Sequence, residues 1–227
     1  MGIQKRRSPN PEERRRVLCD AAIQLLADEG AKGLSHPKVD SFAGLPNGST
    51  SFYFRTRSAL LMAAAERLAE LDLVDLMSVA EPANPGSSEG LDFPVDAPRL
   101  ATMVMLSASE PRLSRTKARF ELMLQANRDP ELAEVFRHNS DVFAELHRRE
   151  ILARSRPGSE PEPHVLEEQT VATMSFVAGV QMRLVAGDRS VASAEQLDRL
   201  LRAVADGVAA EYRDDAKPRR RRATKAD

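Results

Sequence analysis

Apolar residues recur three and four positions apart along most of the chain, which is the spacing of one face of an α-helix. The first such segment spans about residues 11–30, where Leu18, Ala22 and Leu25 fall on one face. A longer segment with the same spacing spans about residues 57–79. No segment shows the two-residue alternation of a strand. The pattern therefore predicts an all-α protein.

Prolines, glycines and small polar residues mark where the later helices begin and end. We expect these helices at about residues 98–109, 111–127, 130–155, 164–186 and 193–212. Asp129 and Ser193 are expected to cap two of them, and Gly187 to end another. Stretches rich in Pro, Gly and Ser, 81–98 and 156–163, are predicted loops. The whole chain then has about nine helices.

Residues 34–61 form the most informative segment. Ser35 is expected to cap a short helix with its hydroxyl, and Gly44 to end that helix in the left-handed conformation. Phe52 and Phe54 are expected to cover a small apolar core. The remaining residues of the second helix, from 47 to 51, are small and polar. Such a helix can approach another surface closely, as a helix in the DNA major groove must, so the segment is predicted to be a helix-turn-helix.

Over about residues 12–61, the residue types and their spacing agree with those of a known protein family. The positions that carry it are Arg14–Leu18, Ala21–Ala22, Leu25–Leu26, Glu29–Gly30, Val39, Ala43–Leu45, Gly48–Ser49, Phe52–Phe54, Arg57 and Leu60–Leu61. In type and spacing they resemble the tetracycline-repressor (TetR) family of transcriptional regulators. Two positions depart from the family: Ser51 replaces a tyrosine that usually contacts DNA phosphate, and Thr50 replaces an apolar residue.

The resemblance implies a three-helix DNA-binding head followed by a helical body for ligand binding and dimerisation. We expect the head at residues 1–56, the body at 57–213 and a disordered basic tail at 214–227. The implied partners are double-stranded DNA, a small-molecule effector of unknown identity and a second copy of the chain.

The position of each residue in the family motif implies the DNA contacts. The implied residues are His36, Lys38, Asn47, Ser49, Ser51, Tyr53, Arg55 and Arg57. An amide such as that of Asn47 can pair with adenine N6 and N7, whereas Lys and Arg bind phosphate. The alternative is that Asn47 only helps to cap its helix and Tyr53 only packs.

Charge is divided unevenly along the chain. Residues 1–58 carry 10 Lys and Arg against 6 acidic residues, and residues 213–227 carry 7 against 3. Residues 59–212 carry 16 against 25, although the whole chain has a net charge of only −1. Both ends are therefore expected to attract polyanions while the middle repels them.

The last two predicted helices show the pattern of a dimerisation pair that closes a four-helix bundle with its symmetry mate. The expected interface residues are Ala172, Ser175, Val177, Gly179, Val180, Leu197, Leu200, Leu201, Val204 and Val208. The alternative is that both faces pack inside one subunit.

The central helices carry methionines and phenylalanines at helical spacing. The family has an effector cavity among these helices, which implies the following lining residues. They are Met103, Leu106, Phe120, Met123, Leu124, Phe136, Phe143 and Met174. The same spacing is that of an ordinary core, so a core role is the alternative for each.

These features favour a ligand-responsive DNA-binding regulator, a repressor that acts as a homodimer on a palindromic operator. The alternative is a helical adaptor that binds a protein or an anionic surface through its basic ends. No metal-binding spacing, nucleophile motif or phosphate loop is present, so we expect no enzyme, no catalytic residue, no metal and no cofactor. The lone Cys19 and the lack of a long apolar run are typical of a cytoplasmic protein without a membrane span.

Overall fold

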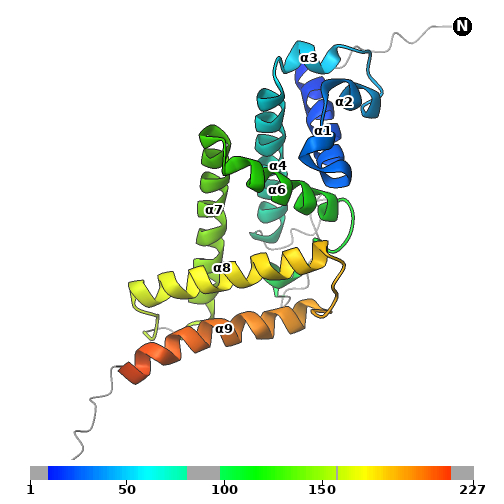
Figure 1. The fold of residues 1–227 in the computed structure, drawn as a ribbon. Helices are drawn as coiled ribbons and strands as arrows, with labels where there is room; N and C mark the ends of the chain where they lie inside the picture. Colours follow the sequence, from blue (N-terminus) through cyan, green and yellow to red (C-terminus); the bar gives the residue numbers. More distant parts are fainter. Residues whose placement is uncertain (1–9, 81–97, 157, 216–227) are drawn as a thin grey trace, which may run out of the picture.

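The computed structural model describes residues 10–80, 98–156 and 158–215, and these residues form nine helices and no strand. The helices are α1 (Pro11–Gly33), α2 (His36–Phe42), α3 (Ser49–Tyr53), α4 (Arg57–Ala80), α5 (Arg99–Leu106), α6 (Arg112–Ala126), α7 (Pro130–Arg154), α8 (Pro163–Val185) and α9 (Ala194–Asp215). Figure 1 shows α1–α3 at one end of the molecule and the paired helices α8 and α9 at the other. The predicted all-α fold is confirmed. Within the described residues, no helix combines the length and the apolarity that a membrane span requires.

The ends of the helices follow local chemistry. The Asp129 carboxylate accepts from the amides of Glu131 and Leu132 at 3.2 Å each, as expected of an N-cap. The Ser193 hydroxyl accepts from the Gln196 amide at 3.2 Å. The prediction for Ser35 is wrong in one respect. Its backbone is extended, but its hydroxyl accepts no capping hydrogen bond.

A first apolar core joins the head to the body. Leu18 and Leu26 of α1 pack with Leu60 of α4, and all three are almost completely buried. Ala118 and Leu122 of α6 belong to the same core. This core contains residues from both sides of the predicted domain boundary at residue 56. The start of α4 is therefore attached to the head by packing as well as by the chain. The domain boundary at 56 and 57 stays a prediction.

A second core holds the far end of the body together. Leu100 and Val104 of α5 pack there with Leu184 of α8 and with Leu197 and Leu201 of α9. The Gln169 side-chain amide also donates to the Ala205 carbonyl at 2.9 Å, which ties α8 to α9. The two helices are therefore joined by apolar packing and by a hydrogen bond.

The segment between α7 and α8 forms the predicted loop, apart from residue 157, which is not described. The predicted loop at 81–98 and the tail at 214–227 lie almost entirely outside the described residues, as does most of the N-terminal arm. In the tail, residues 214 and 215 are described as the last residues of α9.

Candidate nucleic-acid interface and ligand cavity

Two glycines shape the turn that separates α2 from α3. Gly44 has a φ of +64° and Gly48 a φ of +91°, and side chains with a Cβ rarely adopt such angles. Between them the Leu45 amide donates to the Asp40 carbonyl at 2.9 Å, which closes the end of α2. The turn is therefore specified by residues that permit left-handed geometry, as the sequence predicted for Gly44.

A buried carboxylate holds the start of α3. Asp40 Oδ2 accepts from the Gly48 amide at 2.8 Å, and Oδ1 accepts from the Thr50 amide at 2.7 Å and the Thr50 hydroxyl at 2.5 Å. Asp40 and Thr50 are both almost inaccessible to solvent. The carboxylate thus satisfies donors at the N-terminus of α3 that no residue of α3 itself caps. Sequence analysis missed Asp40. The only signal was an acidic residue next to Val39 on the buried side of α2.

Two opposing effects act on the Asp40 carboxyl. Burial raises its pKa, but the hydrogen bonds from Thr50 and Gly48 and the nearby His36 outweigh burial and leave the pKa below its ordinary value. Asp40 is therefore a carboxylate at neutral pH and accepts all three hydrogen bonds. The Thr50 departure from the family pattern has a structural role here, because its hydroxyl completes this cluster.

With Thr50 facing inward, the opposite side of α3 faces solvent. Ser51 is exposed, Phe52 is 78% exposed, and Asn47 is exposed in the turn that leads into the helix. The prediction that Phe52 covers the core is wrong, because Phe52 lies on the far side of the helix from Thr50. Phe54 does lie in the core, with 2% exposure.

Three predicted DNA contacts in α2 and α3 have partners within the head. His36 Nε2 donates to the Phe54 carbonyl at 2.7 Å and so ties the start of α2 to the end of α3. Lys38 forms an ion pair with Glu29 of α1. Ser49 donates its hydroxyl to the Pro46 carbonyl at 2.6 Å. These side chains have a local structural partner that the sequence did not reveal.

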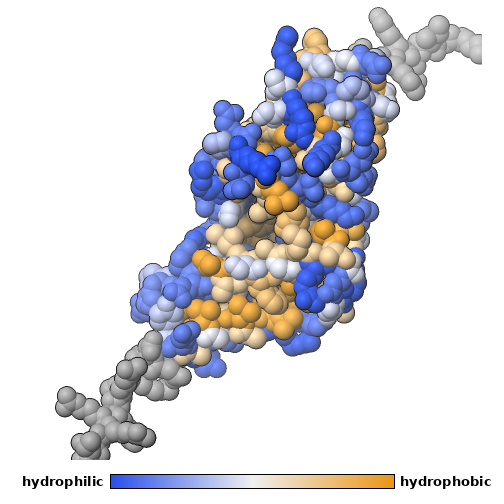
Figure 2. Space-filling view, in the orientation of Figure 1, coloured by the Kyte–Doolittle hydropathy of each residue, from blue (hydrophilic) through white to orange (hydrophobic). Residues whose placement is uncertain are grey.

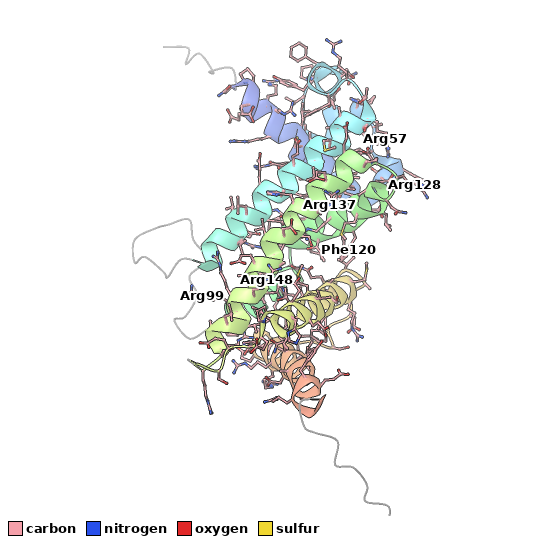
Figure 3. The ribbon with its side chains drawn as sticks, turned by 90° about the vertical axis from the view of Figure 1, so that its left-hand side faces the viewer. Arg57, Arg99, Phe120, Arg128, Arg137 and Arg148 are labelled. Atoms are coloured by element: carbon pink, nitrogen blue, oxygen red, sulfur yellow. The ribbon has the colours of Figure 1, made fainter. Side chains whose placement is uncertain are left out.

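The remaining three lie at the end of α3 or shortly after it. Tyr53 is half-buried and packs edge-on against Phe52, with ring centroids 5.1 Å apart. Arg57 lies at the head end of α4 (Figure 3), where its guanidinium donates to the Ala31 carbonyl. Arg55 is exposed, and no ion pair or hydrogen bond of its side chain is found within the described part of the chain. Arg55 is thus the cation best placed for a polyanion beside α3.

Residues of helices α4 to α8 line a partly open cavity of about 220 Å³, here called the central cavity. Five of the predicted lining residues do line it. They are Met103, Met123, Phe136, Phe143 and Met174.

The other three predicted lining residues, Leu106, Phe120 and Leu124, do not line the central cavity. On α6, Arg119 and Met123 face the cavity. Phe120 and Leu124 directly follow these two residues in the sequence, so they point about 100° away around the helix axis. Phe120 (Figure 3) is therefore half-buried elsewhere, and Leu124 is 69% exposed.

Charged side chains cross one wall of the central cavity. Arg112 of α6 makes a bidentate ion pair with Asp75 of α4, at 2.8 and 3.0 Å. Arg115 approaches the same carboxylate at 3.4 Å, and Arg119 pairs with Asp72. The sequence analysis missed these five residues. The three arginines are spaced at i, i+3 and i+7 on α6, which places them on one face of the helix. This spacing was the available signal in the sequence.

A neutral imidazole lies in the opposite wall. His147 Nδ1 is 3.0 Å from the Thr173 hydroxyl, which itself donates to the Gln169 carbonyl at 2.8 Å. That hydroxyl must therefore accept from His147 Nδ1–H, which leaves Nε2 as an acceptor. Burial, with a smaller effect of Arg154, lowers the pKa of His147 to about 4.

Each of α8 and α9 carries an exposed stripe of apolar and small residues. Val171 is 56% exposed and Met182 is also exposed, and the two residues lie about three turns apart on the same face of α8. Around Gly179 of α8 and Gly207 of α9 there is open space, since an added Cβ would meet nothing within 4 Å. Figure 2 shows apolar surface gathered over these two helices, in contrast with the mostly hydrophilic head.

The residues predicted for the dimer interface divide into two groups. Ser175, Gly179 and Leu200 are exposed, and Ala172, Val204 and Val208 are half-buried. Val177, Val180, Leu197 and Leu201 lie in the second core of the single chain. For these four the prediction is wrong, because side chains already buried within one subunit have no surface left for a partner. Val171 and Met182, which the sequence analysis left out, lie on the exposed face instead.

The described residues thus form an all-helical molecule with a helix-turn-helix at one end and a cavity in its middle. Residues 97–207 match the family described as "Tetracyclin repressor-like, C-terminal domain". Over these residues the chain belongs to the TetR family of transcriptional regulators. No curated protein matches its sequence.

Solved structures share this fold along nearly their whole length. A transcriptional regulator from Rhodococcus sp. Rha1 is 17% identical, with a TM-score of 0.63 over 87% of this chain and 96% of that one. A TetR-family member from Streptomyces coelicolor A3 is 23% identical, with a TM-score of 0.58 over 85% and 98%. A protein from Saccharomonospora viridis in complex with choline is 17% identical, with a TM-score of 0.62 over 86% and 95%.

Proposed function

We propose that this protein is a ligand-responsive DNA-binding repressor that acts as a homodimer on a palindromic operator. The observation that carries the proposal is the exposed face of α3, which Asp40 holds in place from the inside. Its residues are small or planar and leave the helix backbone accessible. A helix of this kind fits the major groove, where each base pair presents a distinct pattern of donors and acceptors.

The residues divide by the contacts that they offer to DNA. Asn47 and Ser51 present hydrogen-bonding groups to base edges, and the exposed ring of Phe52 suits a thymine methyl group. Arg55 is assigned to a backbone phosphate, which fixes register without reading sequence. His36 and Lys38 have structural partners within the head. Their role in this proposal is to hold α2 and α3 in position.

Dimerisation follows from the exposed apolar face of α8 and α9. Two glycines with open space above them allow the helices of a second subunit to approach closely. Val171, Met182 and Leu200 supply apolar area around these glycines. A two-fold axis through this face gives each dimer two copies of α3, as a palindromic operator requires.

The response to a ligand is assigned to α6, because this helix contacts both the central cavity and the head. One face lines the central cavity with Arg112, Arg115 and Arg119. The other packs on α1, where Glu121 accepts from the Ala31 amide at 3.0 Å. A ligand that prefers one position of α6 therefore also selects a position of the head, and its affinity is linked to that for DNA.

Retention of genomic DNA fragments by the full-length protein, with excess random competitor duplex present, tests the proposal. We expect a small set of fragments to be retained. Ser51→Glu places a negative charge on the exposed face of α3 and should abolish retention through repulsion by phosphates. Ser159→Glu makes the same change in the exposed loop before α8 and should retain the same fragments.

A helical adaptor that binds anionic surfaces would give a different result. It would hold fragments without selection and lose them all to the competitor. Equal retention by both variants would also contradict the proposal, since α3 would then lie outside the contact.

A further inference from the structure

We propose that the central cavity binds an amphipathic organic anion, with its negative group at Arg115 and its apolar part among the side chains of α5, α7 and α8. The inference rests on the proposed function, because it names the chemical class of the effector for the same cavity. Its basis is the charge, the hydrogen bonding and the composition of the cavity wall.

Among the described residues, the charges that line the cavity sum to an excess of one positive charge. Three arginines of α6 face two aspartates of α4, Asp72 and Asp75. His147 is the other ionisable residue in the lining, and with a pKa of about 4 it is neutral at neutral pH. A partly buried cavity with uncompensated positive charge favours an anion.

Both aspartates already have cationic partners. Asp75 accepts two hydrogen bonds from Arg112 and a longer one from Arg115, and Asp72 accepts from Arg119 and from Asn139. A cationic ligand would have to displace one of these guanidinium groups before it met a carboxylate. The wall therefore opposes a cation twice, by its net charge and by the occupation of its carboxylates.

Arg115 has the greatest capacity for a new partner. Its single ion pair within the described residues spans 3.4 Å, longer than the 2.7–2.9 Å usual for charge-assisted hydrogen bonds. Its guanidinium carries five N–H donors in a planar arrangement that matches a carboxylate. A ligand anion can therefore bind at Arg115 while Asp75 keeps its bidentate partner Arg112.

The rest of the lining suits the apolar part of such a ligand. Met103, Met174, Phe136 and Phe143 offer flexible and aromatic surface, and His147 Nε2 offers an acceptor for a ligand hydroxyl or amide. No tryptophan or tyrosine is present among the lining residues, so the aromatic faces that best hold quaternary ammonium groups are missing. In this respect the cavity is poorly suited to choline, which the Saccharomonospora viridis protein binds.

Calorimetric titration of the full-length protein with three probes of equal chain length tests the inference. The probes are octanoate, octanamide and octyltrimethylammonium. We expect octanoate to bind most tightly of the three. Arg115→Gln should weaken octanoate roughly tenfold to a hundredfold, the loss expected for a charged hydrogen-bonding partner, while Arg115→Lys should weaken it less.

The control variant is Arg149→Gln, which removes an arginine from the exposed side of α7 and should bind octanoate like the wild type. Thermal melting of each variant without probe shows whether it folds. Tighter binding of the cation, no binding of octanoate, or equal octanoate affinity in folded Arg115→Gln would overturn the inference. Octanoate binding needs no DNA, so binding through Arg115 with no selective DNA retention would refute the proposed function alone.

Discussion

A single carboxylate decides whether the proposed reading helix is held in place. α3 has only five residues, too few to be stable by itself in water. Asp40 gives it a fixed start by accepting from Gly48 and from both donors of Thr50. The sequence predicted where α2 and α3 lie, because glycines and prolines act locally. It did not predict the Asp40 cluster, which depends on residues ten positions apart meeting in space.

Loss of the Asp40 carboxylate should destabilise the head. We expect Asp40→Ala to lower the free energy of unfolding by about 2–4 kcal/mol, because the two buried donors of Thr50 and the partly buried Gly48 amide lose their acceptor. Thr50→Val removes one hydrogen bond and should cost about 1 kcal/mol. Urea denaturation of the two single variants and the double variant measures both effects. The double variant should lose less than the sum, and strict additivity would show that the two residues do not act together.

His147 should make stability depend on pH in a defined window. Its pKa lies at about 4 in the folded chain, below its ordinary value of 6.5. The unfolded chain therefore binds the proton more readily, and unfolding takes up a proton between these two values. The stabilising effect is complete above pH 6.5 and is lost as the pH falls toward 4, to a total of about 3 kcal/mol at most.

Urea denaturation at several pH values compares the wild type with His147→Gln, in which other groups titrate alike. The wild type should lose stability faster than the variant between pH 6.5 and 4. Parallel pH profiles would show that His147 does not titrate differently in the folded and unfolded chains.

Among the helices, α6 connects the head with the central cavity, because one of its faces packs on the head and the other lines the cavity. The helical spacing of the sequence predicted α6 within one residue at each end. The family resemblance implied that Phe120 and Leu124 line the cavity, and spacing alone could not correct this because it does not show which face of a helix meets which neighbour. The row of arginines at 112, 115 and 119 was a better guide to the cavity face than the apolar residues.

The contact between α6 and α1 should be measurable at one amide. We expect Glu121→Ala to lower the free energy of unfolding by about 1–2 kcal/mol, since the Ala31 amide loses its acceptor. Glu121→Gln keeps an acceptor oxygen and should cost less. Hydrogen exchange at the Ala31 amide should be faster in Glu121→Ala than in Glu121→Gln. Equal exchange in both variants would contradict the role given to this hydrogen bond.

At the scale of the whole molecule, the exposed face of α8 and α9 is assigned to a second subunit. Val171→Asp places a charge in that face, and we expect the dimer to dissociate because the charge would be buried unpaired. Sedimentation at micromolar concentration measures the change. Val74→Asp is the matched control, since Val74 is 63% exposed on α4, outside this face. A dimeric Val171→Asp would place the interface elsewhere.

The sequence predicted the positions of α8 and α9. It did not distinguish the face of this pair that is buried within the subunit from the face that is exposed. The sequence analysis placed Val177, Val180, Leu197 and Leu201 in the dimer interface together with Leu200, yet four of these five side chains fill the core of the single chain. A helix that packs on its own subunit and also meets a partner carries apolar residues on two faces. Only the three-dimensional structure separates them, because it shows which face is already covered.

The central claim is that α3 reads DNA and that each active molecule presents two copies of it. Selection of bound duplexes from a random pool by the full-length protein tests this most directly. We expect an inverted repeat whose half-sites lie about one helical turn, 34–36 Å, or a multiple of it apart. Asn47→Ala should relax the preference at one symmetric pair of positions. A consensus without two-fold symmetry, or an Asn47→Ala consensus unchanged at every position, would contradict the claim.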